Sequence, residues 1–344
     1  MTNSHFYAEI MGQADALARL LEAYSAPDGR RRLASVPAAQ HPVLMGMGAS
    51  FHGALFGAGH LHQMGLSAQA MEATDVIYGD GARMNKAQPL IYISQSGFSG
   101  EIAPVLERLI ETSHLVALTN DEQSHLARHA QVVLPLLAGD EQFVATKTYV
   151  NSLAVLWLLA RHWLGTLNDA AFDELRWAQA LLAQRLADGP GAAARLVEEM
   201  GQAQTFVFIG SSQQSVTARQ AAMMTMEWLK LPALSSTVGA FRHGPIEIAQ
   251  PGLGVVIFAA PGAAYGPSLR LAQTLQSYGA SVLVVENGQV RAPGEPPAPH
   301  GPAVADNLSS LLNVAPVQLF IEVLARQRGI SPGFRHIDKV ATAL

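Results

Sequence analysis

Short apolar runs alternate with helical segments along this sequence, and the alternation occurs twice. The apolar runs of the first half lie at 43–50, 90–97, 114–120 and 132–139, and those of the second half lie at 205–212, 254–262 and 281–288. Runs that stay apolar throughout predict strands buried on both faces, as in parallel sheets covered by helices. A repeat about 160 residues apart predicts two similar doubly wound α/β domains rather than one large sheet.

The same pattern sets the expected domain boundaries. We expect an N-terminal helix at 1–27, a first domain at 28–165, a helical connector at 166–200, a second domain at 201–330 and a tail at 331–344. Helical spacing predicts that the apolar residues of the first helix point inward: Ile10, Ala14, Leu17, Leu20 and Leu21. A last helix is expected at about 313–328, and the proline-rich segment 289–305 should have little regular structure.

Composition excludes several classes of protein. With 49% apolar and 14% charged residues among 344, a large core is expected and disorder is not. A net charge of −5 gives no basic excess, so neither a nucleic acid nor a membrane is an expected partner. The absence of cysteine excludes disulfides and thiolate chemistry. No signal-type core or run of 18 apolar residues is present, so a cytoplasmic protein is expected.

The stretch LIYISQSGFSGE, at 90–101, predicts an anion site. An apolar run ends in Ser94, Gln95, Ser96 and Gly97, Ser99 follows, and 102–111 has a helical pattern. A helix start provides N–H groups and a positive dipole end, and ligands of open parallel sheets lie beyond the carboxyl ends of strands. A serine-capped helix is the simpler alternative, but three serines within six residues exceed what capping requires. We therefore expect a phosphate monoester to bind here.

A second glycine-rich turn, GMGASFHG at 46–53, follows the first predicted strand. It lacks the GxGxxG spacing of a dinucleotide site, and no acidic residue follows at the usual place, so NAD binding is not expected. The histidines form no metal-spaced cluster such as HExxH, so we expect neither a metal nor another cofactor. His52, beside Ser50 in this turn, stays open as a site residue.

Several motifs together resemble one family. In chain order they are EIxxQ at 9–13, GMGASFHG, SQSGFSGE, VATKTY, a helix through Glu227, HGP at 243–245 and a C-terminal lysine. This combination resembles the sugar isomerase (SIS) family, specifically the double-SIS group, over nearly the whole chain. That group includes the isomerase half of glucosamine-6-phosphate synthase, SIS-type glucosamine-6-phosphate deaminases and fructosamine-6-phosphate deglycases. The resemblance implies two tandem flavodoxin-like SIS domains, with parallel sheets and flanking helices.

The resemblance also implies roles for individual residues. The sugar phosphate would be held by hydroxyl and amide side chains, namely Ser50, Ser94, Gln95, Ser96, Ser99 and Thr146. Glu227 would be the catalytic base. His243 would open the sugar ring and would reach the site from a partner subunit, and Lys339 would condense with the open-chain ketose as a Schiff base.

The surrounding sequence supports the roles implied for Glu227 and His243, and it also leaves simpler structural roles open for some of these residues. Glu227 lies in an apolar helix, where Met223, Met224 and Leu231 are expected to desolvate it, and it precedes His243 by 243 − 227 = 16 residues, as in the family. A histidine suits proton movement near neutral pH. The alternatives are a glutamate on an exposed helix face, a solvated tail for Lys339, and a capping or surface role for Lys147.

Three positions depart from the family pattern. Ala49 stands where the synthase has a threonine, Met224 where a lysine is usual, and Ala240 where an acidic residue is common. The substrate therefore stays open among phosphosugars, including adducts with an acidic group.

These features lead to one main hypothesis and two alternatives. The main one is a phosphosugar isomerase or deaminase acting on a hexose 6-phosphate, with an amino sugar favoured, through base-catalysed C1–C2 proton transfer. The alternatives are a fructosamine-6-phosphate deglycase and a non-catalytic sugar-phosphate sensor. We expect a homodimer with shared active sites, and no glutaminase activity, because no cysteine nucleophile is present to support one.

Overall fold

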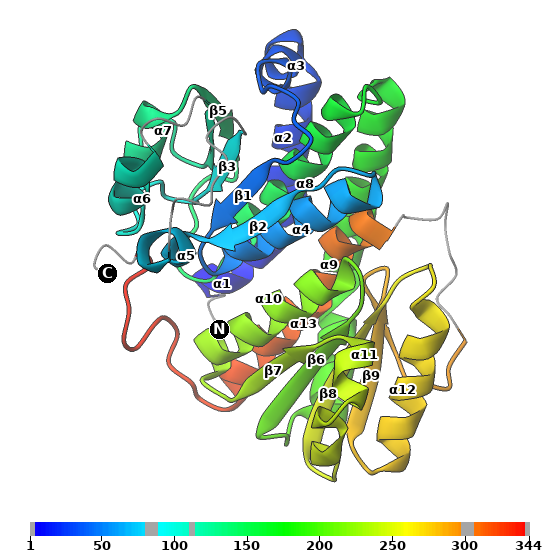
Figure 1. Ribbon diagram of the computed structural model, residues 1–344. Helices are drawn as coiled ribbons and strands as arrows, with labels where there is room; N and C mark the ends of the chain where they lie inside the picture. The colour runs from blue at the N-terminus through cyan, green and yellow to red at the C-terminus, as the bar shows by residue number, and fades with distance from the viewer. Residues whose placement is uncertain (1–3, 80–88, 110–113, 297–305, 341–344) are drawn as a thin grey trace. The chain divides into compact units, whose positions relative to one another are not determined.

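The computed structural model describes residues 4–79, 89–109, 114–296 and 306–340. By contacts the chain divides into two compact units. The first unit consists of Gly12–Trp177 and Arg335–Leu344, and the second consists of Met1–Met11 and Ala178–Phe334. Each unit therefore contains one end of the chain and most of one half of the sequence repeat (Figure 1).

The first unit contains a five-stranded, fully parallel sheet in the order β2-β1-β3-β4-β5. Its strands are β1 (Val43–Gly46), β2 (Gln69–Glu72), β3 (Leu90–Ile93), β4 (Leu115–Thr119) and β5 (Val132–Pro135). The central strands β1, β3 and β4 are buried along their whole length, because helices cover both faces of the sheet. All five carboxyl ends consequently lie at one edge of the sheet.

Helices of the first unit form two layers around this sheet. They are α2 (Gln13–Ser25), α3 (Pro27–Ala34), α4 (Ala49–Gln63), α5 (Ala73–Tyr78), α6 (Ile102–Leu109), α7 (His125–His129), α8 (Lys147–Trp163) and the start of α9 (Asp169–Met200). Apolar residues of α5, α6 and α7 pack on one face, against side chains such as Met45 and Tyr92. The other face is covered by α4 and by the almost fully buried α8, where Gly53 faces Ile93 and Leu156.

The second unit contains a five-stranded sheet in the order β10-β9-β8-β6-β7. Its strands are β6 (Thr205–Gly210), β7 (Ala233–Ser236), β8 (Leu253–Ala259), β9 (Ser281–Glu286) and β10 (Gln289–Arg291). Four strands are parallel and β10 runs antiparallel to β9. Only Asn287 and Gly288 separate these two strands, and both residues have positive φ, as a tight hairpin turn requires.

Helices also cover both faces of the second sheet. They are α1 (His5–Met11), α10 (Gln214–Met224) with a π-helical continuation (Thr225–Leu229), α11 (Val238–Arg242), a 3₁₀ turn (Pro245–Ile248), α12 (Tyr265–Ser277) and α13 (Asp306–Gln327). One face packs against α11 and α12 through residues such as Phe241 and Leu275. The other face packs against α10 and α13, where the rings of Phe206 and Phe320 lie 5.7 Å apart.

One helix of the described chain, α13, is long and apolar enough to span a membrane over Asn307–Gln327. However, 94% of its most apolar window is buried inside the protein. That burial is typical of a core helix of a globular protein.

The predicted fold class is confirmed: two parallel α/β sheets with flanking helices follow one another along the chain. Two local expectations were wrong. The first helix breaks at Gly12 into α1 and α2, although all five residues expected to point inward are buried. The segment 289–305 begins with a strand, β10, that pairs with β9. The domain boundaries proposed from the sequence stay a prediction.

Candidate functional site

The serine turn follows β3 and leads into α6. The backbone of Ser94 continues the sheet by donating to the carbonyl of Leu118 at 3.0 Å. Inside the turn, the Ser94 hydroxyl accepts from the Gly97 N–H at 3.1 Å, and the Ser96 hydroxyl accepts from the Phe98 N–H at 3.2 Å. A hydroxyl that accepts a bond still has its own hydrogen to donate. The turn therefore fixes two hydroxyl oxygens whose hydrogens can meet an anion.

Close packing holds the turn in this conformation. Gly97 has φ +67°, and a Cβ atom placed there would lie 2.1 Å from the Ser124 hydroxyl. Its carbonyl accepts from the Leu126 N–H at 3.1 Å, and the neighbouring carbonyl of Gln95 accepts from the Asn120 N–H at 3.0 Å. A side chain at position 97 would separate the turn from α7, so the glycine of SQSG is a steric requirement.

Asn120 is a structural residue of this edge that the sequence analysis missed. Its side-chain amide donates to the carbonyl of Gly139 at 2.9 Å, and its side-chain oxygen accepts from the Ala138 N–H at 2.9 Å. Together with its backbone bond to Gln95, these contacts connect the ends of three adjacent strands. An asparagine at the carboxyl end of the predicted run 114–120 was the available signal.

Ser50 lies at the start of α4, just after β1. Gly46, at the end of that strand, has no room for a Cβ atom, which would lie 2.7 Å from the backbone of Ser50. Ser50 is half-buried. Because β1 and β3 are parallel neighbours, Ser50 and the serine turn lie at the same sheet edge.

The loop after β5 contains a buried carboxylate, Glu141, that the sequence analysis also missed. One of its oxygens accepts from the N–H of Thr146 at 2.8 Å, the hydroxyl of Thr146 at 2.9 Å and the N–H of Thr148 at 3.2 Å. Its second oxygen accepts from the hydroxyl of Thr148. Thr146, a predicted ligand residue, is fully buried and serves in the structure to hold this carboxylate.

Lys339 is docked against this loop. Its ammonium group lies 3.5 Å from Glu141 and donates to the carbonyl of Phe143, and its side chain is 23% exposed. The structure thus places the C-terminal lysine near the edge that contains the serine turn, within the first unit. Lys147, at the start of α8, donates instead to the carbonyl of Asp140.

Glu227 lies in the second unit, within the π-helical segment that continues α10. Segments of π-helix are rare in proteins, and those that are present are frequently located at functional sites. Glu227 is half-buried, whereas its neighbour Met226 is exposed. The segment ends at Lys230, which has φ +57° and donates to the carbonyls of Glu227 and Gly333, the latter at 2.8 Å.

A buried carboxylate on α13 holds the residue next to Glu227. Glu322 accepts from the indole N–H of Trp228 at 2.9 Å and from the hydroxyl of Ser4 at 2.7 Å. The ring of Phe6 lies 4.5 Å from that of Trp228. The N-terminal helix α1 therefore packs onto the segment that contains Glu227.

His243 lies at the end of α11 and is exposed. The following Gly244 has φ +126°, so the turn into Pro245 needs a residue without a side chain. Glu227 precedes the amino end of β7, while His243 follows its carboxyl end. The two residues therefore flank β7, a four-residue strand that spans about 13 Å.

The departures from the family pattern differ in their surroundings. Met224, where a lysine is usual, is fully buried in α10 and contributes to the core. Ala240 is exposed on α11. His52, which stayed open, is buried in α4.

The sheet order, the serine turn and the buried α8 can now be compared with known proteins. Residues 38–161 match the SIS domain. The first unit contains a SIS domain. The match includes Ser50, the serine turn and the Glu141 loop, so the matched region contains all six residues predicted to hold the sugar phosphate.

Relatives extend this similarity beyond the SIS domain. The chain is 28% identical over 291 residues to a glutamine–fructose-6-phosphate aminotransferase (isomerizing) of Methanothermobacter thermautotrophicus, covering 83% of this chain and 48% of the relative. It spans about half the length of the curated relatives it matches.

Two solved structures show the same fold. One is the C-terminal domain of the glucosamine-fructose-6-phosphate aminotransferase of Francisella tularensis, with TM-score 0.85, 18% identity and coverage of 95% of this chain and 97% of that one. The other is the glucosamine-6-phosphate deaminase of Thermotoga maritima, with TM-score 0.80, 21% identity and coverage of 98% and 99%. Both likenesses include the second unit as well as the SIS domain of the first.

Proposed function

We propose that this protein is a phosphosugar isomerase or deaminase that acts on a hexose 6-phosphate, with an amino sugar as the favoured substrate. The observation that carries the proposal is the arrangement at one edge of the first sheet. There, fixed serine hydroxyls follow β3, and a docked lysine contacts the loop after β5. Serine hydroxyls can donate hydrogen bonds to a phosphate, and a lysine can react with a sugar carbonyl. The similarity to an isomerizing aminotransferase of fructose 6-phosphate supports the same class of substrate.

In this proposal the first unit binds the substrate. The Ser94 and Ser96 hydroxyls, together with Ser99 and Gln95, hold the phosphate, and remote binding of the phosphate orients the reacting carbons. The ammonium group of Lys339 lies near the buried Glu141 and meets the open-chain carbonyl. Loss of a proton from the lysine then allows its nitrogen to attack that carbonyl, and water leaves as the Schiff base forms.

The second unit supplies proton transfer. Glu227 removes the proton from one of the two carbons C1 and C2 and returns it to the other, and His243 moves a proton on and off the ring oxygen. Glu227 and His243 lie beyond opposite ends of β7, which favours a site completed by two chains. We therefore propose a homodimer with two shared sites.

The test is incubation of the protein in D₂O with fructose 6-phosphate, glucosamine 6-phosphate and a fructosamine 6-phosphate bearing an amino acid. Deuterium in the recovered sugar, ketose formation and free ammonia are followed together. We expect deuterium at C1 or C2, with ammonia released from the amino sugar if the enzyme is a deaminase. Release of an amino acid would instead identify a deglycase. Tight binding of a phosphosugar with no exchange for any substrate would overturn the enzymatic proposal and leave a sensor.

A further inference from the structure

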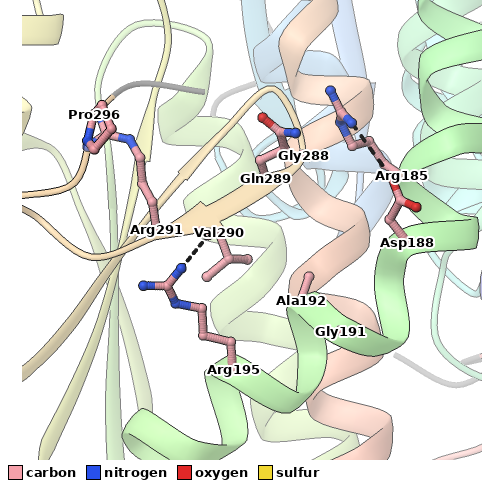
Figure 2. Close-up of a pocket in the computed structure, with 10 residues that line it drawn as sticks. All are labelled: Arg185, Asp188, Gly191, Ala192, Arg195, Gly288, Gln289, Val290, Arg291 and Pro296. Carbon is pink, nitrogen blue, oxygen red and sulfur yellow. Dashed lines mark hydrogen bonds and ion pairs between the residues drawn. The ribbon is translucent and has the colours of Figure 1, made fainter. Parts of the chain in front are cut away.

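A cavity of about 400 Å³ lies in the second unit, between α9 and the β9–β10 hairpin (Figure 2). None of the residues predicted from the sequence to bind or transform a substrate lines it. Its volume is within the range of small-molecule sites. The cavity therefore raises a separate question about what it binds.

One face of α9 forms a wall of the cavity. Arg185, Asp188, Ala192 and Arg195 recur at helical spacing, and Figure 2 shows them along the same side of the helix, opposite the hairpin. Between the two arginines the helix contains the sequence Gly-Pro-Gly at 189–191, which is unfavourable in a helix interior. A Cβ atom at Gly191 would meet nothing within 4 Å. The small residues at 191 and 192 leave the space between the two guanidinium groups open.

Arg185 is the buried cation of this cavity. Its side chain is only 10% exposed, and its Nε donates to the carbonyl of Asn287 at 2.8 Å. Its terminal nitrogens make no hydrogen bond within the described structure, and the Asp188 carboxylate lies 4.0 Å away with 67% of its own side chain exposed. Burial lowers the pKa of Arg185, because desolvation disfavours the charged form. A mostly buried guanidinium whose ion pair with Asp188 is long, and whose partner is mostly exposed, gains further stability if an anion binds to it.

The other two arginines differ from Arg185. Arg291 is paired with the fully buried Glu286 at 3.0 Å, so its charge is already balanced. Arg195 is paired with Glu295, but their side chains are 40% and 43% exposed. An exposed pair of this kind contributes little, so Arg195 can exchange Glu295 for a ligand at small cost. Two guanidinium groups are therefore available to one anion.

We propose that this cavity is a second ligand site, which binds a small phosphate monoester through Arg185 and Arg195. The two terminal nitrogens of Arg185 present a planar fork suited to two phosphate oxygens. Asp188 and Gln289 supply polar partners for hydroxyl groups on the remainder of the ligand. None of the described residues that line the cavity is aromatic, so it offers no platform for stacking a base. A sugar phosphate fits this lining better than a nucleotide does.

The test measures binding of glucose 6-phosphate by equilibrium dialysis, with glucose as the control for the phosphate. It uses the Ser94→Ala/Ser96→Ala protein, which weakens the separate site proposed at the serine turn. We expect saturable binding of glucose 6-phosphate to remain there. Adding Gly191→Glu should weaken it at least tenfold, since a carboxylate at this open position competes for both arginines. Ala194→Glu adds the same charge on an exposed part of α9 outside the cavity and should change the affinity less than twofold.

A second variant tests the cation directly. Arg185→Lys retains the charge but lacks the fork, and it should weaken binding of glucose 6-phosphate at least fivefold with a circular dichroism spectrum like that of the parent. The proposal is overturned if the doubly substituted protein binds no glucose 6-phosphate, or if Gly191→Glu and Ala194→Glu have equal effects. It is also overturned if glucose binds as tightly as its phosphate. None of these outcomes bears on the serine turn. That turn is tested separately, by comparing the affinity of the Ser94→Ala/Ser96→Ala protein for phosphosugar with that of the parent.

Discussion

The two units have the same strand order but different turns at their sheet edges. Read in chain order, each sheet places its strands as second, first, third, fourth and fifth. After the third strand, the first unit continues with the sequence SQSGFS at 94–99, whereas the second continues with APGAAY at 260–265. The second turn has no hydroxyl before Tyr265 and cannot reproduce the phosphate contacts of the first. Repetition of the fold has therefore not repeated the site.

The fifth strands differ as well, and the difference has a local cause. In the first unit, α7 separates β4 from β5 and lets the chain return parallel. In the second unit, two residues separate β9 from β10, and a connection that short forces an antiparallel pair. This hairpin lies against α9 and forms one wall of the arginine-lined cavity. In our proposals the first unit binds the substrate phosphate, and the second supplies proton transfer and a further anion site.

The largest expected effect comes from removing the base assigned to the second unit. Glu227→Gln keeps the shape of the side chain and should lower C1–C2 exchange by roughly 10²- to 10⁴-fold, with phosphosugar binding retained. The measurement is deuterium incorporation from D₂O. Glu199→Gln, an exposed glutamate on α9, is the matched control and should leave exchange unchanged. Undiminished exchange in Glu227→Gln would end its assignment as the base.

The next prediction concerns the contrast between the two turns. Ser94→Ala and Ser96→Ala should each cost about 1.5–3 kcal/mol of binding to a charged group, which raises KM for a phosphorylated substrate about tenfold or more. Ser235→Ala, at an exposed position on β7, should have no effect. Steady-state kinetics and circular dichroism distinguish lost binding from lost fold. If the double variant binds phosphosugar as tightly as the parent, the phosphate site lies elsewhere.

The units also differ in the burial of their histidines. His60 in the first unit is almost fully buried beside Trp157, and burial, with a smaller effect of the Arg161 charge, lowers its pKa to about 4. The described histidines of the second unit, His5 and His243, are exposed. His60 thus stays neutral in the folded protein while it takes up a proton when unfolded. Its contribution to stability is present above pH 6.5 and is lost as the pH falls toward 4.

From these pKa values the loss amounts to about 2 kcal/mol at pH 5. Denaturant unfolding at pH 7 and pH 5 measures it. In His60→Gln, which does not titrate, the difference in unfolding free energy between the two pH values should shrink by about that amount. His129→Gln, at an exposed position of the same unit, should retain the parent's pH dependence. Equal pH dependence in His60→Gln and the parent would contradict this role for His60.

The strands that the sequence predicted coincide with apolar runs, and all but the edge strand β5 are buried along all or nearly all of their length. The edge strands β2 and β7 were not predicted, because no residue of β2 and only Ala233 of β7 is buried, so neither strand forms a continuous apolar run. The strand β10 was missed because Pro293 and the prolines after it led us to expect little regular structure over the whole of 289–305. Its pairing depends on the hairpin turn at Asn287 and Gly288, which the periodicity of apolar residues does not report.

The local structure of the serine turn could be predicted from the sequence, whereas the residues that support it could not. Ser94 and Ser96 could be identified because a strand, a turn and a helix start are local features. Glu141 could not, because its role depends on bringing Lys339, almost 200 residues later, against the loop after β5. Likewise, α1 packs in the second unit and the docked tail in the first, an exchange of chain ends that no local pattern encodes.

The smallest expected effect is a partial recovery of activity, and it tests whether Glu227 and His243 of one site come from different chains. Glu227 precedes β7 and His243 follows it, and in our proposal each site takes these two residues from different chains. An inactive Glu227→Gln chain mixed with an inactive His243→Ala chain should therefore recover activity. If chains exchange at random, half of the dimers are mixed and one of their two sites is intact, which gives roughly a quarter of the parent's activity. Chain exchange is verified by native mass spectrometry with one chain isotopically labelled. No recovery despite exchange would mean that His243 acts within its own subunit or has no part in the reaction.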